Sequence, residues 1–331
     1  MKRVVISCVL LAMLGVACSQ GASDGPTATP MGSEGRCGDG VCDGPEDATR
    51  CPQDCDADAL SVSREEATYQ VINPASGARL HVRVLYPQAW DGEVLPALVL
   101  VPGGTGDSSD FLDQLDRTQA IADGGFVLVL FDPDGRGLSE GSEDQNGYVH
   151  QDGLAAVIRF AATLPEVDEE QIGLVSWSYG VTMAAGALAR HDDLPVRFYI
   201  DWEGPANRDD TGGCGEDAVG HLQGHPCDDE DFWREREAST LIMQIWVPYL
   251  RLQSERDHAQ PDNDHALLMI ANATAEQYGG HGHAPWTRLN DLTPNTVYDV
   301  ANPPPMIPEG DDRDVGALVV INAHELLALA W

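Results

Sequence analysis

Short apolar runs recur along the chain from residue 67 onward, and each has the length of a β-strand. The runs at 95–101 and 126–131 are apolar at almost every position, as in strands that are buried on both faces of a parallel sheet. Asn73 to Gly77 has the composition of a hairpin turn between the first two runs. The other candidate strands lie at 67–72, 79–86, 172–175, 196–202 and 249–252.

Between most of these runs, the apolar residues are spaced as on one face of a helix. The predicted helices lie at 110–123, 153–164, 179–190, 232–246 and 262–276. Strands that alternate with helices predict right-handed βαβ units and a mostly parallel sheet with flanking helices. Binding and catalytic sites of such sheets lie at the carboxyl ends of the strands.

One of these strand-to-helix junctions carries a serine, in the stretch Ser176-Trp-Ser178-Tyr-Gly180. The small residues Ser176 and Gly180 on either side of Ser178 allow a sharp turn without a steric clash. Ser178 then lies at the start of a helix, where the backbone N–H groups and the helix dipole favour negative charge. The pattern predicts an exposed, reactive serine; the alternative is an ordinary solvated turn.

Composition adds that the chain is strongly acidic and has features of an exported protein. Its 331 residues include 54 acidic and 19 basic residues, and the net charge of −35 disfavours nucleic acid and anionic membranes as partners. A basic start followed by an apolar run predicts a signal peptide at 1–17. The next residues resemble a bacterial lipoprotein box with Cys18 as the lipidated cysteine, although Gly15 replaces the usual leucine; plain cleavage and secretion is the alternative.

The remaining cysteines fall into a cluster and a distant pair, which indicates disulfides in an exported chain. A flexible tether at 18–36 precedes a small module at 37–55, which resembles secreted C-G-D-G-x-C modules and leaves the pairing of its cysteines open. Its acidic residues are of the kind that binds Ca²⁺, or they form a solvated face. Cys214 and Cys227 are expected to staple a lid-like insertion at about 206–246 within the main domain, 56–331. The module's four cysteines are Cys37, Cys42, Cys51 and Cys55, and its acidic residues are Asp39, Asp43, Glu46 and Asp47.

Residues 67–331 resemble the α/β-hydrolase fold in the order of their elements. The stretches that carry the resemblance are Pro102-Gly-Gly104, Gly135-Arg-Gly-Leu-Ser-Glu-Gly141, the Ser178 turn and Ser254-Glu-Arg-Asp257-His-Ala-Gln-Pro261. The resemblance implies a catalytic serine, acid and histidine in that chain order, with no metal or organic cofactor. It makes Ser178 the nucleophile and Asp257 the acid, with Asp201 as the rival acid, and places the Tyr179 and Gly104 N–H groups in the oxyanion hole.

The base is less well defined by the sequence. His324 follows the strand-like segment 317–322 and would be the base if that segment is the last strand, but 314–331 also fits a single terminal helix. His283 and His281 have a spacing from Asp257 that is more typical of the family, yet no convincing strand precedes them. If 286–289 is the last strand, neither histidine follows it and a base is missing. His258 and His265 are interpreted as structural or solvent-facing.

The sequence is compatible with three functions. The first is an envelope-anchored or secreted serine hydrolase that cleaves a carboxylic ester or lactone through an acyl-enzyme. The second keeps the fold but cleaves an amide or peptide, as serine exopeptidases do, with Asp201, Glu203 or the acidic insertion binding a substrate ammonium group. The third is a non-catalytic surface-binding protein, which requires that no histidine can reach Ser178.

Overall fold

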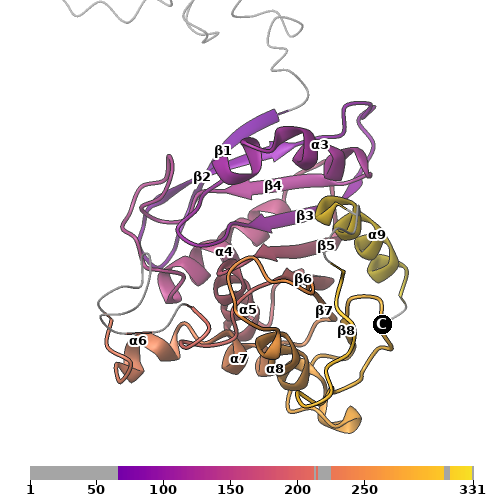
Figure 1. Cartoon of the computed structure of the whole chain (residues 1–331). Helices are drawn as coiled ribbons and strands as arrows, with labels where there is room; N and C mark the ends of the chain where they lie inside the picture. The colour runs from indigo at the N-terminus through magenta and orange to yellow at the C-terminus, as the bar shows by residue number, and fades with distance from the viewer. Residues whose placement is uncertain (1–65, 212–213, 215–224, 309–313, 330–331) are drawn as a thin grey trace, which may run out of the picture. The chain divides into compact units, whose positions relative to one another are not determined.

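The computed structural model describes residues 66–211, 214, 225–308 and 314–329 (Figure 1). The described residues belong to the unit Val62–Trp331. The predicted signal peptide at 1–17, the lipidated Cys18, the tether at 18–36 and the cysteine-rich module at 37–55 with its Ca²⁺ ligands lie outside the described residues. They remain predictions.

An eight-stranded sheet runs through the middle of the described fold in the order β1-β2-β4-β3-β5-β6-β7-β8 (Figure 1). The strands are β1 (Glu66–Ile72), β2 (Arg79–Leu85), β3 (Leu95–Val101), β4 (Val127–Phe131), β5 (Val167–Trp177), β6 (Phe198–Trp202), β7 (Tyr249–Leu252) and β8 (Thr287–Leu289). Strand β2 pairs antiparallel with β1 and β4, and all other neighbours pair in parallel. The predicted mostly parallel sheet is therefore confirmed.

Both faces of the sheet are apolar because its central strands bury alternate residues on opposite sides. In β3, Ala97, Val99 and Val101 belong to one core cluster, whereas Leu98 and Leu100 belong to the other. Helices α4, α5, α7 and α8 contribute buried residues to the first cluster, and α2, α3 and α9 contribute to the second. This double burial explains why β3 and β4 read as continuous apolar runs.

Several predicted helices are divided or shifted in the structure. The segment 110–123 forms two helices because the chain turns at Gln114, and 232–246 breaks into three short pieces. The helices are α2 (Ser109–Leu112), α3 (Leu115–Asp123), α4 (Tyr148–Ala161), α5 (Gly180–Arg190), α6 (Glu230–Arg234), α7 (Ala238–Leu241), α8 (Asp264–Ala273) and α9 (Val315–Ala328), with 3₁₀ turns η3 (Ile242–Gln244) and η4 (Glu276–Tyr278). Among the described helices, none has the length and apolar character needed to cross a membrane.

Of the two alternatives left open for the C-terminal segment, the terminal helix is confirmed and the strand at 317–322 is wrong, because this segment lies within α9. The side chain of Asp314 caps the helix by accepting a hydrogen bond from the Gly316 N–H at 2.6 Å. Val319, Ala323 and Leu326 are spaced along one helical face and are buried in the second core cluster. Packing against the sheet and α3 therefore outweighs the weak strand preference of the β-branched residues.

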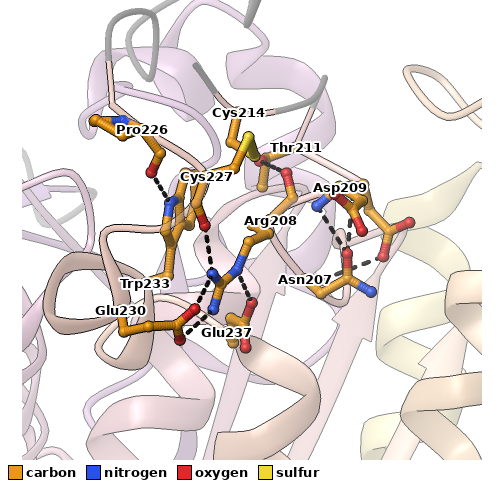
Figure 2. Close-up of a disulfide and its surroundings, with 11 residues drawn as sticks. Asn207, Arg208, Asp209, Thr211, Cys214, Pro226, Cys227, Glu230, Trp233 and Glu237 are labelled. Atoms are coloured by element: carbon orange, nitrogen blue, oxygen red, sulfur yellow. Dashed lines mark hydrogen bonds and ion pairs between the residues drawn. A yellow bond between two sulfur atoms is a disulfide. The ribbon is translucent and has the colours of Figure 1, made fainter.

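The predicted pairing of Cys214 with Cys227 is confirmed, and an arginine supports it (Figure 2). The Arg208 guanidinium donates to the Cys227 carbonyl at 2.7 Å and forms ion pairs with Glu230 and Glu237 at 2.9 and 2.5 Å. Its carbon Cζ lies 5.7 Å from the ring centre of Trp233. Closing this loop, across a sequence separation of 13, stabilises the fold by about 3 kcal/mol in the chain-entropy model.

Candidate active site

Ser178 lies on the sharp turn that the sequence predicts between β5 and α5. Its φ of 50° is in the left-handed region, which non-glycine residues adopt mainly at turns and functional sites. Glycine is required at position 180, because a Cβ there would lie 2.5 Å from the Pro102 carbonyl oxygen. Ser176, the small residue on the other side of Ser178, fits into the core because its hydroxyl is hydrogen-bonded to the Tyr199 hydroxyl at 2.7 Å.

His258 is the histidine that reaches this serine. Its Nε2 lies 2.9 Å from Ser178 Oγ, within hydrogen-bond range. It lies in the loop that follows β7, and its ring stacks on Trp202 with ring centres 5.0 Å apart. The interpretation of His258 as structural or solvent-facing is therefore wrong, because its ring, although 35% exposed, contacts the serine.

Glu203 completes a line of three groups by binding the other nitrogen of the same ring. His258 Nδ1 lies 2.9 Å from Glu203 Oε2. Glu203 follows β6 directly, is 1% exposed and has a left-handed φ of 49°. The backbone N–H groups of Ser254 and His258 also donate to its carboxylate, at 3.0 and 3.2 Å. The carboxylate is thus fixed by the loop that carries the histidine.

His258 and Glu203 stabilise each other's charged forms. The hydrogen bond to Glu203 raises the pKa of His258 above its ordinary value; burial opposes the rise and the charge of Asp257 adds to it. Burial alone would raise the pKa of Glu203, but the hydrogen bonds from His258 and Ser254 outweigh it and lower that pKa. With His258 neutral and its Nδ1–H donated to Glu203, Nε2 is left to accept the proton of Ser178.

We expect the pH dependence of turnover to follow His258. Only the neutral ring accepts the serine proton, so kcat/KM falls as the pH drops through the pKa of His258. Because this pKa is raised, the acid limb should lie above the value of about 6.5 of an unperturbed histidine. A pH profile of kcat/KM from acidic to mildly alkaline pH checks this expectation. An acid limb clearly below that of an unperturbed histidine would contradict it.

Asp257, the acid that the resemblance implies, is close to the histidine but is engaged elsewhere. Its Oδ1 lies 3.5 Å from His258 Nδ1 and accepts hydrogen bonds from the backbone of Ala259 and Gln260 at 2.7 and 2.8 Å. Its Oδ2 accepts from Gln253 at 2.9 Å. Burial opposes ionisation, but the neighbouring His265 and these bonds hold the pKa of Asp257 well below its usual range. Asp257 therefore shapes the loop that presents His258, and Glu203 makes the shorter contact.

The rival acid, Asp201, is committed to a buried ion pair. It is fully buried and pairs with Arg251, and it accepts a hydrogen bond from the Tyr249 hydroxyl at 3.0 Å. Neither Asp201 nor Glu203 is therefore free to bind a substrate ammonium group, as the exopeptidase hypothesis suggested. Asp201 instead belongs to a polar layer beneath the site that includes Ser176.

The structure does not bring the three histidines favoured by the sequence to Ser178. His324 lies in α9, and its Nε2 is 2.8 Å from the carbonyl oxygen of Gly124. Gly124 precedes β4 whereas Ser178 follows β5, and both strands run parallel to β3, so the two residues lie at opposite ends of the strands. His283 stacks on Trp246 with ring centres 4.5 Å apart. The backbone of His281 bonds to Ala271. The proposed bases His324 and His283 are thus wrong as partners of Ser178.

The loop expected to supply the second oxyanion donor does lie against the serine turn. A Cβ at Gly103 would lie 3.0 Å from Ser178 Cβ, and Gly104 has a φ of +52° with open space where its Cβ would be. Tyr179 precedes α5 directly, and its side chain is buried against Trp233 of the disulfide-stapled insertion. Gly103 therefore borders the serine, and Tyr179 follows it directly in the chain. The role of the Tyr179 and Gly104 N–H groups as oxyanion donors remains a prediction.

Glu203, Asp257 and His258 also form a group that could hold a cation, with one ligand atom of each within 4.8 Å of the others. Both ring nitrogens of His258 already have partners, Ser178 at Nε2 and Glu203 at Nδ1. A cation at this position would compete with the hydrogen bond between His258 and Glu203. The donor set is therefore better suited to proton transfer than to metal binding.

Comparison with known proteins supports the fold. In sequence, residues 76–200 are similar to the X-Pro dipeptidyl-peptidase (S15) family; this stretch includes Ser178 and ends before Glu203 and His258. No curated protein is similar enough in sequence to be matched. The match to the S15 family covers less than half of the 331 residues.

Three solved structures illustrate the structural similarity. Dipeptidyl peptidase 4 from Porphyromonas gingivalis superposes with a TM-score of 0.57 at 16% identity, over 80% of this chain and 35% of that one. A puromycin-hydrolysing peptidase from Mycobacterium tuberculosis gives 0.55 at 20% identity, over 79% and 38%. A hypothetical protein from Pseudomonas aeruginosa gives 0.51 at 18% identity, over 80% and 95%. The chain has the α/β-hydrolase fold. It spans little more than a third of each of the two peptidases, and at these identities the likeness concerns the fold alone.

Proposed function

We propose that this protein is a serine hydrolase that cleaves an amide or peptide bond through an acyl-enzyme. The observation that carries the proposal is the continuous line Ser178–His258–Glu203, with both hydrogen bonds at 2.9 Å. The similarity of residues 76–200 to a peptidase family favours an amide over the ester or lactone that the sequence suggested first. The geometric condition of the non-catalytic hypothesis, a serine that no histidine reaches, is not met.

The reaction follows from the positions of these groups. Ser178 Oγ attacks the carbonyl carbon while its proton passes to His258 Nε2. Glu203 stabilises the imidazolium that forms, and the N–H groups of Tyr179 and Gly104 are the proposed donors to the oxyanion. His258 then returns the proton to the leaving amine, and the C–N bond breaks. Water activated by the same histidine hydrolyses the acyl-enzyme and regenerates Ser178.

The proposal is tested with matched substrates that differ only in the bond cleaved. We expect wild-type protein to hydrolyse aminoacyl p-nitroanilides as well as the corresponding p-nitrophenyl esters, because an activated serine able to acylate from an amide also accepts the easier ester. The Ser178→Ala variant, folded by circular dichroism, should cleave neither above background. Hydrolysis of esters without detectable hydrolysis of any anilide would favour the ester or lactone hypothesis and contradict the amide proposal.

A further inference from the structure

A pocket of about 480 Å³ opens beside the serine turn. It lies between the α2–α3 segment, the carboxyl ends of β5 and β6, and the start of α9. Its apolar wall includes Gly103, Phe111, Ile121, Trp177, Trp202 and Val315. Among the described residues, none of those that line the pocket belongs to the disulfide-stapled insertion.

The wall of the pocket is continuous with the reactive groups. Trp177 directly precedes Ser178, and Trp202 directly precedes Glu203. The Trp202 ring also stacks on the ring of His258, with an interplanar angle of 18°. Gly103 borders Ser178, because a Cβ at that position would lie 3.0 Å from Ser178 Cβ. A group that fills this pocket is therefore attached within a few bonds of the carbonyl carbon that Ser178 attacks.

The lining favours a large, flat apolar group. The rings of Phe111 and Trp177 meet edge to face with centres 5.1 Å apart, and both residues line the pocket, so that a bound aromatic ring would pack against other aromatic rings. We propose that the pocket binds the side chain of the residue whose carbonyl Ser178 attacks, and that it selects an aromatic or large aliphatic side chain. This inference rests on the proposed function and names its substrate class.

The charges around the pocket disfavour an acidic substrate side chain. Among the described residues, the carboxylates of Asp110 and Asp113 line the pocket without a hydrogen bond or ion pair. Arg117, which also lines the pocket, forms an ion pair with Asp314 at 2.8 Å. Burial raises the pKa of Asp110, and the neighbouring charges of Asp107 and Asp113 raise it further; together these effects outweigh the opposing positive charge of Arg136. A substrate side chain with its own carboxylate would add to this repulsion.

The test uses covalent probes, so that it does not depend on which bond the enzyme cleaves in nature. Diphenyl aminoalkylphosphonates with the side chain of Phe, Ala or Glu react when Ser178 Oγ bonds to phosphorus. The P–O bond to one phenoxide breaks, and the phenoxide leaves as phenol with the serine proton relayed by His258. The second-order rate of labelling at Ser178 is measured by mass spectrometry, with a small alkyl fluorophosphonate as the side-chain-independent reference.

We expect the Phe probe to label Ser178 about 10- to 100-fold faster than the Ala probe, the effect of burying one large apolar side chain. The Glu probe should be slower than the Ala probe. In Phe111→Ala the advantage of Phe over Ala should shrink at least about threefold, since one wall of the pocket is lost. The matched control is Trp246→Ala, which truncates a 65% exposed aromatic side chain that does not line this pocket and should leave the Phe-to-Ala ratio unchanged.

The outcomes separate this inference from the proposed function. Reaction with the fluorophosphonate but equal rates for Phe and Ala, or a Glu probe as fast as Ala, overturns the pocket assignment and leaves the serine hydrolase intact. Absence of reaction with the fluorophosphonate in folded protein is a failure of the proposed function itself. An equal loss of preference in Phe111→Ala and Trp246→Ala would also overturn the assignment, since the effect would then not be local.

Discussion

Replacing His258 with alanine is expected to lower kcat/KM for a cleaved anilide by about 10⁴- to 10⁶-fold, the range seen when a serine hydrolase loses its base. The reason is geometric: His258 is the histidine whose ring nitrogen lies at 2.9 Å from Ser178 Oγ, so no other described group takes the serine proton. Steady-state kinetics of the purified variant measure this loss, with circular dichroism as the check on folding.

His324→Ala and His283→Ala are the matched controls for this prediction. Each removes an imidazole, but one bonds the Gly124 carbonyl and the other stacks on Trp246, so both variants should keep kcat/KM within about threefold of wild type. Inactivity of either folded control, together with activity in His258→Ala, would contradict the assignment of the base.

Replacing Glu203 with glutamine is expected to lower kcat by about 10⁴-fold, as loss of the triad carboxylate does elsewhere. Glutamine keeps the shape of the side chain but removes the charge that stabilises the imidazolium. The acid limb of the pH profile should also move to lower pH, because the hydrogen bond to Glu203 is the largest cause of the raised pKa of His258. A purely structural role for Glu203 would not move that limb.

Asp257→Asn is the control that separates the two neighbouring carboxylates. Its Oδ1 lies 3.5 Å from His258 Nδ1, against 2.9 Å for Glu203, and its main bonds are to Gln253 and to the loop backbone. We expect a loss of kcat within about tenfold. A larger loss in Asp257→Asn than in Glu203→Gln would restore Asp257 as the catalytic acid.

The sheet could be predicted from the sequence because burial of both faces leaves continuous apolar runs at β3 and β4. The turn at Ser178 could be predicted because its requirements are local: a strand, small flanking residues and a helix within one short stretch. The sequence could not decide between a strand at 317–322 and a terminal helix, because the contacts with α3 and the sheet that make this apolar segment α9 are non-local.

The acid and base could not be predicted in the same way, because the fold brings them together from separate strand ends. The resemblance placed the base after the last strand and the acid after an earlier one. Here Glu203 follows β6 and His258 follows β7, although β8 is the last strand of the described sheet. The residue that follows β8 is Asn290, whose side chain forms hydrogen bonds with the backbone of Gln253.

A signal for Glu203 was nevertheless present in the sequence. It is the first residue beyond the apolar run of β6 and precedes Gly204, just as Ser178 is the first residue beyond β5. A Cβ at Gly204 would lie 2.8 Å from the Ser178 carbonyl oxygen, so the glycine lets the two turns approach each other. Asp201, by contrast, lies within the strand, where its side chain is buried beneath the site.

Fluorophosphonate labelling followed by peptide mapping, on wild type and on Ser178→Ala and His258→Ala, is the decisive experiment for the assignment of this active site. We predict one labelled serine in the wild type, Ser178, with no label in Ser178→Ala and labelling slowed by several orders of magnitude in His258→Ala. A folded wild type that takes up no label, or a label on another serine, would contradict the assignment of Ser178 as the nucleophile.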